Sequence, residues 1–109
     1  RDHGGAWGGH PSWPGRWAGL HASCLWFIRE HDVAVLGWDM MDQHPNEYGI
    51  SFGVHGALFY FGVPLLDNLL LEPLAQACAQ EGRHEFMLVV APLFIPGGTG
   101  SPVNPIAIF

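Results

Sequence analysis

The stretch that decides the fold runs from residue 54 to residue 68 and reads VHGALFYFGVPLLDN. Its first apolar residues recur at the spacing of one helix face, so we predict a short helix over residues 53–61. Gly62 is expected to end this helix because glycine accepts the left-handed conformation that closes many helices. The apolar residues 63–66 are then expected to form a short strand that doubles back on the helix.

His55 and Asp67 lie at the two ends of this helix–strand unit, twelve positions apart. The helix advances about 9 Å and the strand about 13 Å, so a reversal at Gly62 would bring Asp67 back close to His55. An imidazole and a carboxylate that meet in this way could bind zinc or manganese. From the spacing alone, a histidine hydrogen-bonded to a neighbour and an aspartate that caps a turn are the commoner arrangement.

Upstream of this unit, apolar periodicity predicts a helix over residues 20–30, and a short apolar run predicts a buried strand over residues 33–36. Residues 37–49 are polar and are expected to form a loop at the end of that strand. The loop holds Asp39, Asp42, His44 and Glu47. We expect these side chains to be solvated, with a role in lining a substrate or supporting a metal ligand as the open alternative.

Downstream, residues 72–80 are expected to form a helix that Gly82 ends, and residues 85–91 are the clearest candidate for a buried strand. Residues 97–101 (GGTGS) are expected to form a tight turn, because neither a lysine nor a helix follows them as in a phosphate-binding loop. Residues 103–109 return as a last strand that Pro105 confines to an edge or to its own start. Helices and strands thus alternate, which indicates the α/β class.

Composition excludes several classes of function. The chain has 109 residues, of which 49% are hydrophobic and 13% are charged. It contains no lysine, so a Schiff-base lysine and a Walker phosphate loop are excluded. The net charge of -6 argues against nucleic acid as a partner, because phosphates require a basic surface. The longest uncharged apolar stretch, residues 52–66, falls short of the roughly 20 residues of a membrane span.

Two further expectations follow from residue content. Cys24 and Cys78 fit neither a disulfide scaffold nor a zinc ribbon, so we expect reduced thiols and a cytoplasmic location. The 5 tryptophans and 7 phenylalanines exceed what so small a domain can bury, so apolar surface should be left for other chains.

A serine hydrolase is the main alternative. Residues 49–53 (GISFG) match the nucleophile-elbow pattern around Ser51, and residues 3–7 (HGGAW) resemble an oxyanion segment. The order Ser51, Asp67, His84 also matches the triad order of α/β-hydrolases. Against this alternative, a turn rather than a strand precedes Ser51, and the three residues lie too close in sequence for the elements that separate them in that fold.

Four segments carry a resemblance to a known family. They are residues 19–24 (GLHASC), 32–37 (DVAVLG), 62–69 (GVPLLDNL) and the long closing segment 88–109 (LVVAPLFIPGGTGSPVNPIAIF). In sequence and in order they resemble the cyclase family of metal-dependent hydrolases, which includes bacterial kynurenine formamidases and isatin hydrolases. The resemblance implies a swivelling β/β/α-type fold. Residues 1–109 would be the C-terminal part of one such domain, with a mixed sheet, about three helices and an irregular Gly/Trp-rich segment over residues 1–19.

The same resemblance implies a site. The family's later metal-binding pair falls on His55 and on Asp67, where most members have glutamate. The family's N-terminal segment His-x-Gly-Thr-His-x-Asp-x-Pro-x-His has no match, so the histidine that shuttles protons and most of the metal ligands are expected to lie outside this chain.

The implied activity is hydrolysis of an amide or ester bond in a small aryl or cyclic substrate of the N-formylkynurenine type, as in tryptophan catabolism, with zinc or manganese as cofactor. A homodimer or homotetramer is expected, and this chain alone should be inactive. Residues expected to line the substrate pocket are Trp7, Trp13, Phe52 and His44. An inactive subunit or interaction module is the non-enzymatic alternative.

Overall fold

The computed structural model describes residues 19–43, 45–50 and 52–109. The described residues form two compact units that divide after Leu70. Together they contain three helices and three two-stranded sheets, which confirms the predicted small α/β class with about three helices. Among these residues, no helix has the length and apolar character that crossing a bilayer requires.

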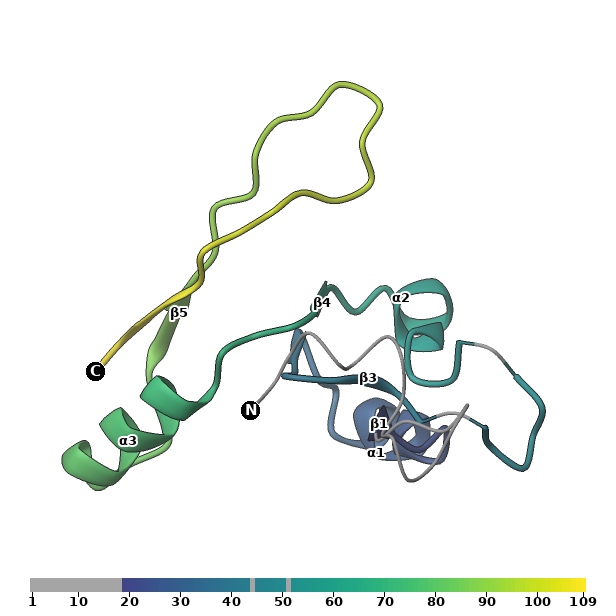
Figure 1. The fold of residues 1–109 in the computed structure, drawn as a ribbon, viewed down its shortest axis with the longest axis horizontal. Coiled ribbons are helices and arrows are strands. Elements are labelled where there is room, and N and C mark those ends of the chain that lie inside the picture. The colour runs from purple at the N-terminus through teal and green to yellow at the C-terminus, as the bar shows by residue number, and fades with distance from the viewer. Residues whose placement is uncertain (1–18, 44, 51) are drawn as a thin grey trace, which may run out of the picture. The chain divides into compact units, whose positions relative to one another are not determined.

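The described residues of the first unit form two helices and four strands of two residues each. In chain order its elements are β1 (Gly19–Leu20), α1 (Cys24–Glu30), β2 (Leu36–Gly37), β3 (Met41–Asp42), α2 (Gly56–Phe61) and β4 (Leu65–Leu66) (Figure 1). The strands pair in two parallel ladders, β1 with β3 and β2 with β4. In the second ladder Gly37 pairs with Leu66, so the residues that follow these two strands lie side by side.

The core of the first unit joins both helices to the segments around them. Its buried members are Ile28, Trp38, Val54, Ala57 and Val63. Val54 and Ala57 have no exposed surface. The small side chain of Ala57 allows α2 to lie close to α1, and the two helices pack against each other.

Helix α1 is shorter than predicted at its start, and the strand after it is displaced. Leu20 belongs to β1, where it pairs with Asp42, so the helix begins only at Cys24. At the other end Asp32 takes a left-handed conformation (φ 46°), and the N–H of Val33 donates to the carbonyl of Ile28 at 3.1 Å. Val33 therefore closes the helix, and the strand expected over residues 33–36 shrinks to Leu36–Gly37.

Helix α2 begins later than predicted and ends where predicted. The residues before Gly56 form a tight turn, in which the N–H of Ala57 donates to the carbonyl of Val54 at 2.9 Å. Gly62 has φ 70° and ends the helix in the left-handed conformation. The following strand is confined to Leu65–Leu66, whose partner β2 is equally short.

The second unit consists of α3 (Glu72–Glu81) and a hairpin of β5 (Met87–Val89) with β6 (Ile106–Ile108). The prediction for α3 is confirmed, with Pro73 in its first turn and Gly82 (φ 67°) after its last residue. The two strands pair antiparallel, and the chain between them makes a long loop (Figure 1). Gly97 (φ 74°) provides the predicted turn within that loop.

The prediction of a buried strand over residues 85–91 is wrong. Only Met87–Val89 are extended, and all three are exposed. Within this unit the strand has one partner, β6, and two of the three β6 residues are exposed as well. A two-stranded hairpin has no second layer to cover its faces, so strongly apolar residues remain in solvent.

Candidate functional site

His55 and Asp67 meet in the first unit, as the reversal at Gly62 predicts. His55 precedes the first residue of α2, and Asp67 follows the last residue of β4. Nε2 of His55 lies 3.3 Å from Oδ2 of Asp67. The side chain of His55 is 16% exposed and that of Asp67 is 36% exposed, so the pair lies at the surface with its histidine mostly covered.

Asp42 holds the opposite side of the His55 ring. Its Oδ2 lies 2.9 Å from Nδ1 of His55. Its Oδ1 accepts the backbone N–H of Val54 at 2.6 Å and that of His55 at 3.3 Å. Asp42 is 5% exposed, so the expectation that the acids of the 37–49 loop are solvated is wrong for this residue. The reason is that β3 pairs with β1 and carries Asp42 beneath the start of α2.

Trp38 holds the other oxygen of Asp67. Its indole N–H donates to Oδ1 of Asp67, and its ring lies 5.1 Å from the ring of His55. The parallel pairing of β2 with β4 explains this contact, because Trp38 and Asp67 follow paired residues. The backbone continues the ladder there, since the N–H of Trp38 donates to the carbonyl of Leu66 at 3.1 Å.

The proton positions in this cluster follow from the hydrogen bonds. A carboxylate can only accept, and both ring nitrogens of His55 face one; we assign the hydrogen of the neutral ring to Nδ1, because its contact with Asp42 is the shorter, at 2.9 Å against 3.3 Å. In a neutral imidazole Nε2 then presents a lone pair, and it faces a second carboxylate, that of Asp67. Two acceptors in contact need a cation between them, which is either a proton on Nε2 or a metal ion.

The geometry of the pair fits a metal ion. Two ligands that each lie about 2.1 Å from a tetrahedral zinc ion are about 3.4 Å apart, close to the separation of Nε2 and Oδ2. Histidine ligands commonly donate their other N–H to a carboxylate, which is the position of Asp42. Within the described ranges no group of three or more His, Cys, Asp or Glu side chains could hold a metal ion, so His55 and Asp67 would form part of a coordination shell.

Comparison with solved structures finds a crystal structure of a protein described as a novel cyclase. The match has a TM-score of 0.73 and 37% sequence identity, and it covers 86% of this chain. The chain resembles the cyclase family. It spans 31% of the length of that cyclase. Neither a protein-family model nor a curated protein matches the chain.

The cyclase-like chain places one of the predicted pocket residues beside the site. The ring of Phe52 stands edge-on to that of His55 with centroids 6.0 Å apart, and Phe52 is 69% exposed. Trp7, Trp13, His44 and Ser51 lie outside the described residues, as does the 3–7 segment. His84, the third member of the serine-hydrolase alternative, is an exposed residue of the second unit.

The remaining acids of the 37–49 loop differ from Asp42. Oε2 of Glu47 lies 2.8 Å from Nε2 of His21. This hydrogen bond is the main cause that lowers the pKa of the exposed Glu47 carboxyl below 4.5. Asp39 also has an interaction partner.

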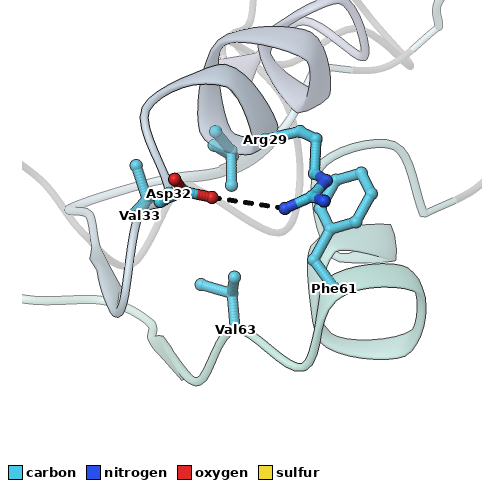
Figure 2. A pocket seen from close by; sticks show the side chains of 6 residues that line it. Arg29, Asp32, Val33, Phe61 and Val63 are labelled. Carbon is cyan, nitrogen blue, oxygen red and sulfur yellow. Dashed lines mark hydrogen bonds and ion pairs between the residues drawn. The ribbon is translucent and has the colours of Figure 1, made fainter.

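A shallow pocket of about 200 Å³ lies elsewhere in the first unit, between α1 and α2. Its lining residues are Ile28, Arg29, Asp32, Val33, Phe61 and Val63 (Figure 2). Two of the lining residues, Arg29 and Asp32, form an ion pair at 3.3 Å, and both are exposed. Neither His55 nor Asp67 lines this pocket, and it holds no nucleophile or metal-ligand cluster.

Sequence reasoning missed the role of Trp38, and for Asp42 it kept the support of a metal ligand only as the open alternative. The signal for Trp38 was its place directly after a short apolar strand, which mirrors the place of Asp67 after the other strand. Asp42 gave a weaker signal, because a two-residue strand inside a polar stretch has no recognisable periodicity.

Proposed function

We propose that this chain forms part of a metal-dependent hydrolase that cleaves an amide or ester bond in a small aryl or cyclic substrate, of the arylformamide type. The observation that carries the proposal is the contact of His55 Nε2 with Asp67 Oδ2 at 3.3 Å, together with the Asp42 carboxylate on Nδ1. The resemblance to a cyclase supports it.

Each residue of the cluster has a distinct task in the proposed site. His55 and Asp67 would hold a zinc or manganese ion through Nε2 and Oδ2. Asp42 keeps the hydrogen on Nδ1, so that the lone pair of Nε2 points outward. Trp38 binds Oδ1 of Asp67 and thereby directs Oδ2 toward His55. When bound, the metal ion supplies a Lewis acid that polarises the substrate carbonyl and lowers the pKa of water.

The position of Phe52 supports the proposal that the substrate carries an aryl group. Its exposed ring stands edge-on to His55 and offers an apolar wall directly beside the proposed ligands. A flat aromatic group could pack against this ring while its carbonyl faces His55 and Asp67.

The site requires residues beyond the described ones. A catalytic zinc usually has three protein ligands, and the described residues provide two. We propose that the remaining ligand and the proton-shuttling histidine come from residues outside the described part or from another chain. A homodimer or homotetramer would bring chains together, and exposed apolar side chains such as Phe59 (78%) and Phe94 (92%) are available for that contact.

The free thiols of Cys24 and Cys78 fit a reducing, cytoplasmic location.

The first test measures metal binding at the pair. Zinc is added to the protein while the imidazole nitrogen resonances are followed by NMR. We expect the Nε2 resonance of His55 to shift, and the shift to vanish in Asp67→Ala. The exposed His31, whose Nδ1 lies 3.0 Å from the carbonyl of Phe27, is the matched control and should not respond. An unchanged His55 resonance, or an equal response in Asp67→Ala, would overturn the proposed metal pair.

The second test measures hydrolysis. An aryl formamide is offered to the protein after EDTA treatment, with and without added zinc or manganese, alone and with a longer cyclase chain that carries the N-terminal metal-binding segment. We expect activity only with metal and in the assembled form, and its loss in His55→Ala. Activity that resists EDTA and disappears in Ser51→Ala would favour the serine hydrolase instead. A stable complex without hydrolysis under any metal would favour an interaction module.

A further inference from the structure

A second polar cluster lies on the segment between β1 and α1. Nδ1 of His21 lies 2.8 Å from Oγ of Ser23, and Nε2 of His21 lies 2.8 Å from Oε2 of Glu47. Ser23 precedes α1, whereas Glu47 comes from the loop after β3. A hydroxyl, an imidazole and a carboxylate thus stand in hydrogen-bonded series, which is the arrangement that activates nucleophilic serines.

The backbone determines which nitrogen of His21 carries the hydrogen. The N–H of Ser23 donates to Nδ1 at 3.2 Å, so Nδ1 must be the acceptor. The Ser23 hydroxyl must therefore also donate its hydrogen to Nδ1. Nε2 carries the ring hydrogen and donates it to the Glu47 carboxylate. The hydroxyl hydrogen of Ser23 is thus bonded to the basic nitrogen Nδ1 of His21. The Glu47 carboxylate accepts the hydrogen on the other ring nitrogen, Nε2.

We propose that Ser23 is a nucleophile, with His21 as its base and Glu47 as the positioning residue, and that it accepts an acyl or phosphonyl group from activated esters. This inference goes beyond the metal-dependent activity and does not rest on it, since neither His55 nor Asp67 takes part.

In the proposed step, Oγ of Ser23 attacks the electrophilic carbon or phosphorus, and a new bond to Oγ forms. The bond to the leaving group breaks, and the leaving group departs with its electron pair as an alkoxide or, from a fluorophosphonate, as fluoride. The hydroxyl proton moves to Nδ1 of His21. The resulting imidazolium is stabilised by the Glu47 carboxylate on its Nε2–H.

The cluster is open to such reagents. Ser23 is exposed, and the side chains of His21 and Glu47 are 27% and 63% exposed. The ring of Tyr48 lies 5.6 Å from that of His21 and provides an aromatic surface next to the base. An ester with an aryl leaving group could pack there.

The surrounding backbone limits the chemistry to acylation. The N–H groups of Cys24, Leu25 and Trp26 donate to the carbonyls of His21, Ala22 and Ser23 at 2.9, 3.1 and 3.1 Å. These N–H groups are therefore not free to stabilise an oxyanion, which fast turnover requires. We expect one covalent event per chain rather than rapid hydrolysis.

The test uses a fluorophosphonate probe on the protein in the presence of EDTA, with the modified residue located by peptide mass spectrometry. We expect modification of Ser23. Ser101 is the control within the chain, because its hydroxyl donates to the carbonyl of Pro102 at 3.1 Å rather than to an imidazole. Ser101→Ala should leave the rate unchanged, and Ser23→Ala should abolish it. No modification at all, or equal modification of Ser101, would overturn the proposal.

Two variants test the roles of the partners. His21→Gln should slow the modification of Ser23 about a hundredfold, the usual contribution of a general base. Glu47→Leu should slow it about tenfold and reduce the fraction of His21 that carries its hydrogen on Nε2, as read from the imidazole nitrogen resonances. Circular dichroism checks that both variants stay folded. A rate that is unchanged in folded His21→Gln would contradict the assignment of the base. Because EDTA is present throughout, a failure of the Ser23 proposal leaves the metal-dependent proposal intact. A failure of the metal-dependent proposal likewise leaves the Ser23 proposal intact.

Discussion

The indole N–H of Trp38 donates a hydrogen bond to Oδ1 of Asp67, and this bond joins the end of β2 to the end of β4. Trp38 is 4% exposed and belongs to the core of its unit, so the hydrogen bond connects the core directly to the candidate metal ligand.

Replacing Trp38 by phenylalanine removes the donor but keeps an aromatic ring. We expect a loss of about 2 kcal/mol in the free energy of unfolding, because the carboxylate loses a charged hydrogen bond. The zinc response of His55 should also weaken, since Asp67 is free to turn away. Urea denaturation and the NMR titration measure the two effects. The control is Trp26→Phe at a residue 71% exposed, which should change stability by less than about 0.5 kcal/mol.

Replacing Asp42 by alanine leaves two backbone N–H groups and Nδ1 of His55 without their acceptor. We expect the protein to lose roughly 3 kcal/mol of unfolding free energy. In Asp42→Asn the amide can donate to Nδ1, so the ring hydrogen of His55 should move to Nε2 and zinc binding should fall. Asp32→Asn is the matched control, because Asp32 is exposed and asparagine tolerates its φ of 46°. Equal effects at positions 32 and 42 would contradict this account.

Replacing Val54 by alanine tests the core beneath the site. Val54 is fully buried, so we expect a loss of about 2 kcal/mol in the free energy of unfolding from lost burial and the cavity that remains. Val35→Ala, at a residue 39% exposed, should cost clearly less. Denaturant unfolding of both variants provides the comparison, and equal losses would argue against a core centred on Val54.

The carboxyl of Glu47 should titrate at a pKa below 4.5, because the hydrogen bond from His21 favours its charged form. Its pKa is lower in the folded than in the unfolded chain. The small stabilisation that it provides is therefore present above pH 4.5 and lost as the pH falls through the folded pKa. NMR titration of the Glu47 carboxyl carbon measures this value. His21→Leu should return it toward 4.5, whereas His31→Leu should not move it.

Phe94 tests the proposed self-association. It is 92% exposed in the loop between β5 and β6, so Phe94→Ser should leave the stability of the chain unchanged. If exposed apolar residues of this loop join copies of the chain, the variant should associate more weakly than the wild type. In analytical ultracentrifugation its oligomer should therefore dissociate at a protein concentration at which the wild-type oligomer is still intact. A wild type that remains monomeric at all concentrations would contradict the predicted homo-oligomer.

Local sequence was sufficient for several parts of this structure. Gly62 and Gly82 end helices where expected because only glycine adopts their left-handed conformation without strain. The approach of His55 to Asp67 was also predictable, since it depends on one helix, one turn and one strand that are adjacent in sequence. Helix α3 was predicted for the same reason, from its own periodicity and its first-turn proline.

Other parts depend on segments that are distant in sequence. The strands β1 and β3 are two residues long, and nothing in residues 37–49 marks the position that enters a ladder. The prediction for residues 85–91 failed for a related reason, since an apolar strand is buried only if another layer covers it.

By itself, the sequence determined the α/β class and the residues at which the helices stop, and it showed that a reversal at Gly62 would bring His55 and Asp67 together, because local propensity and chain reversal govern these features. Only the tertiary structure decided that Asp42 is buried beneath His55 and that Trp38 binds Asp67. Both contacts depend on parallel strand pairing, which places Asp42 beside Leu20 and brings the ends of β2 and β4 together. This pairing depends on hydrogen bonds between backbones rather than on any local pattern of side chains.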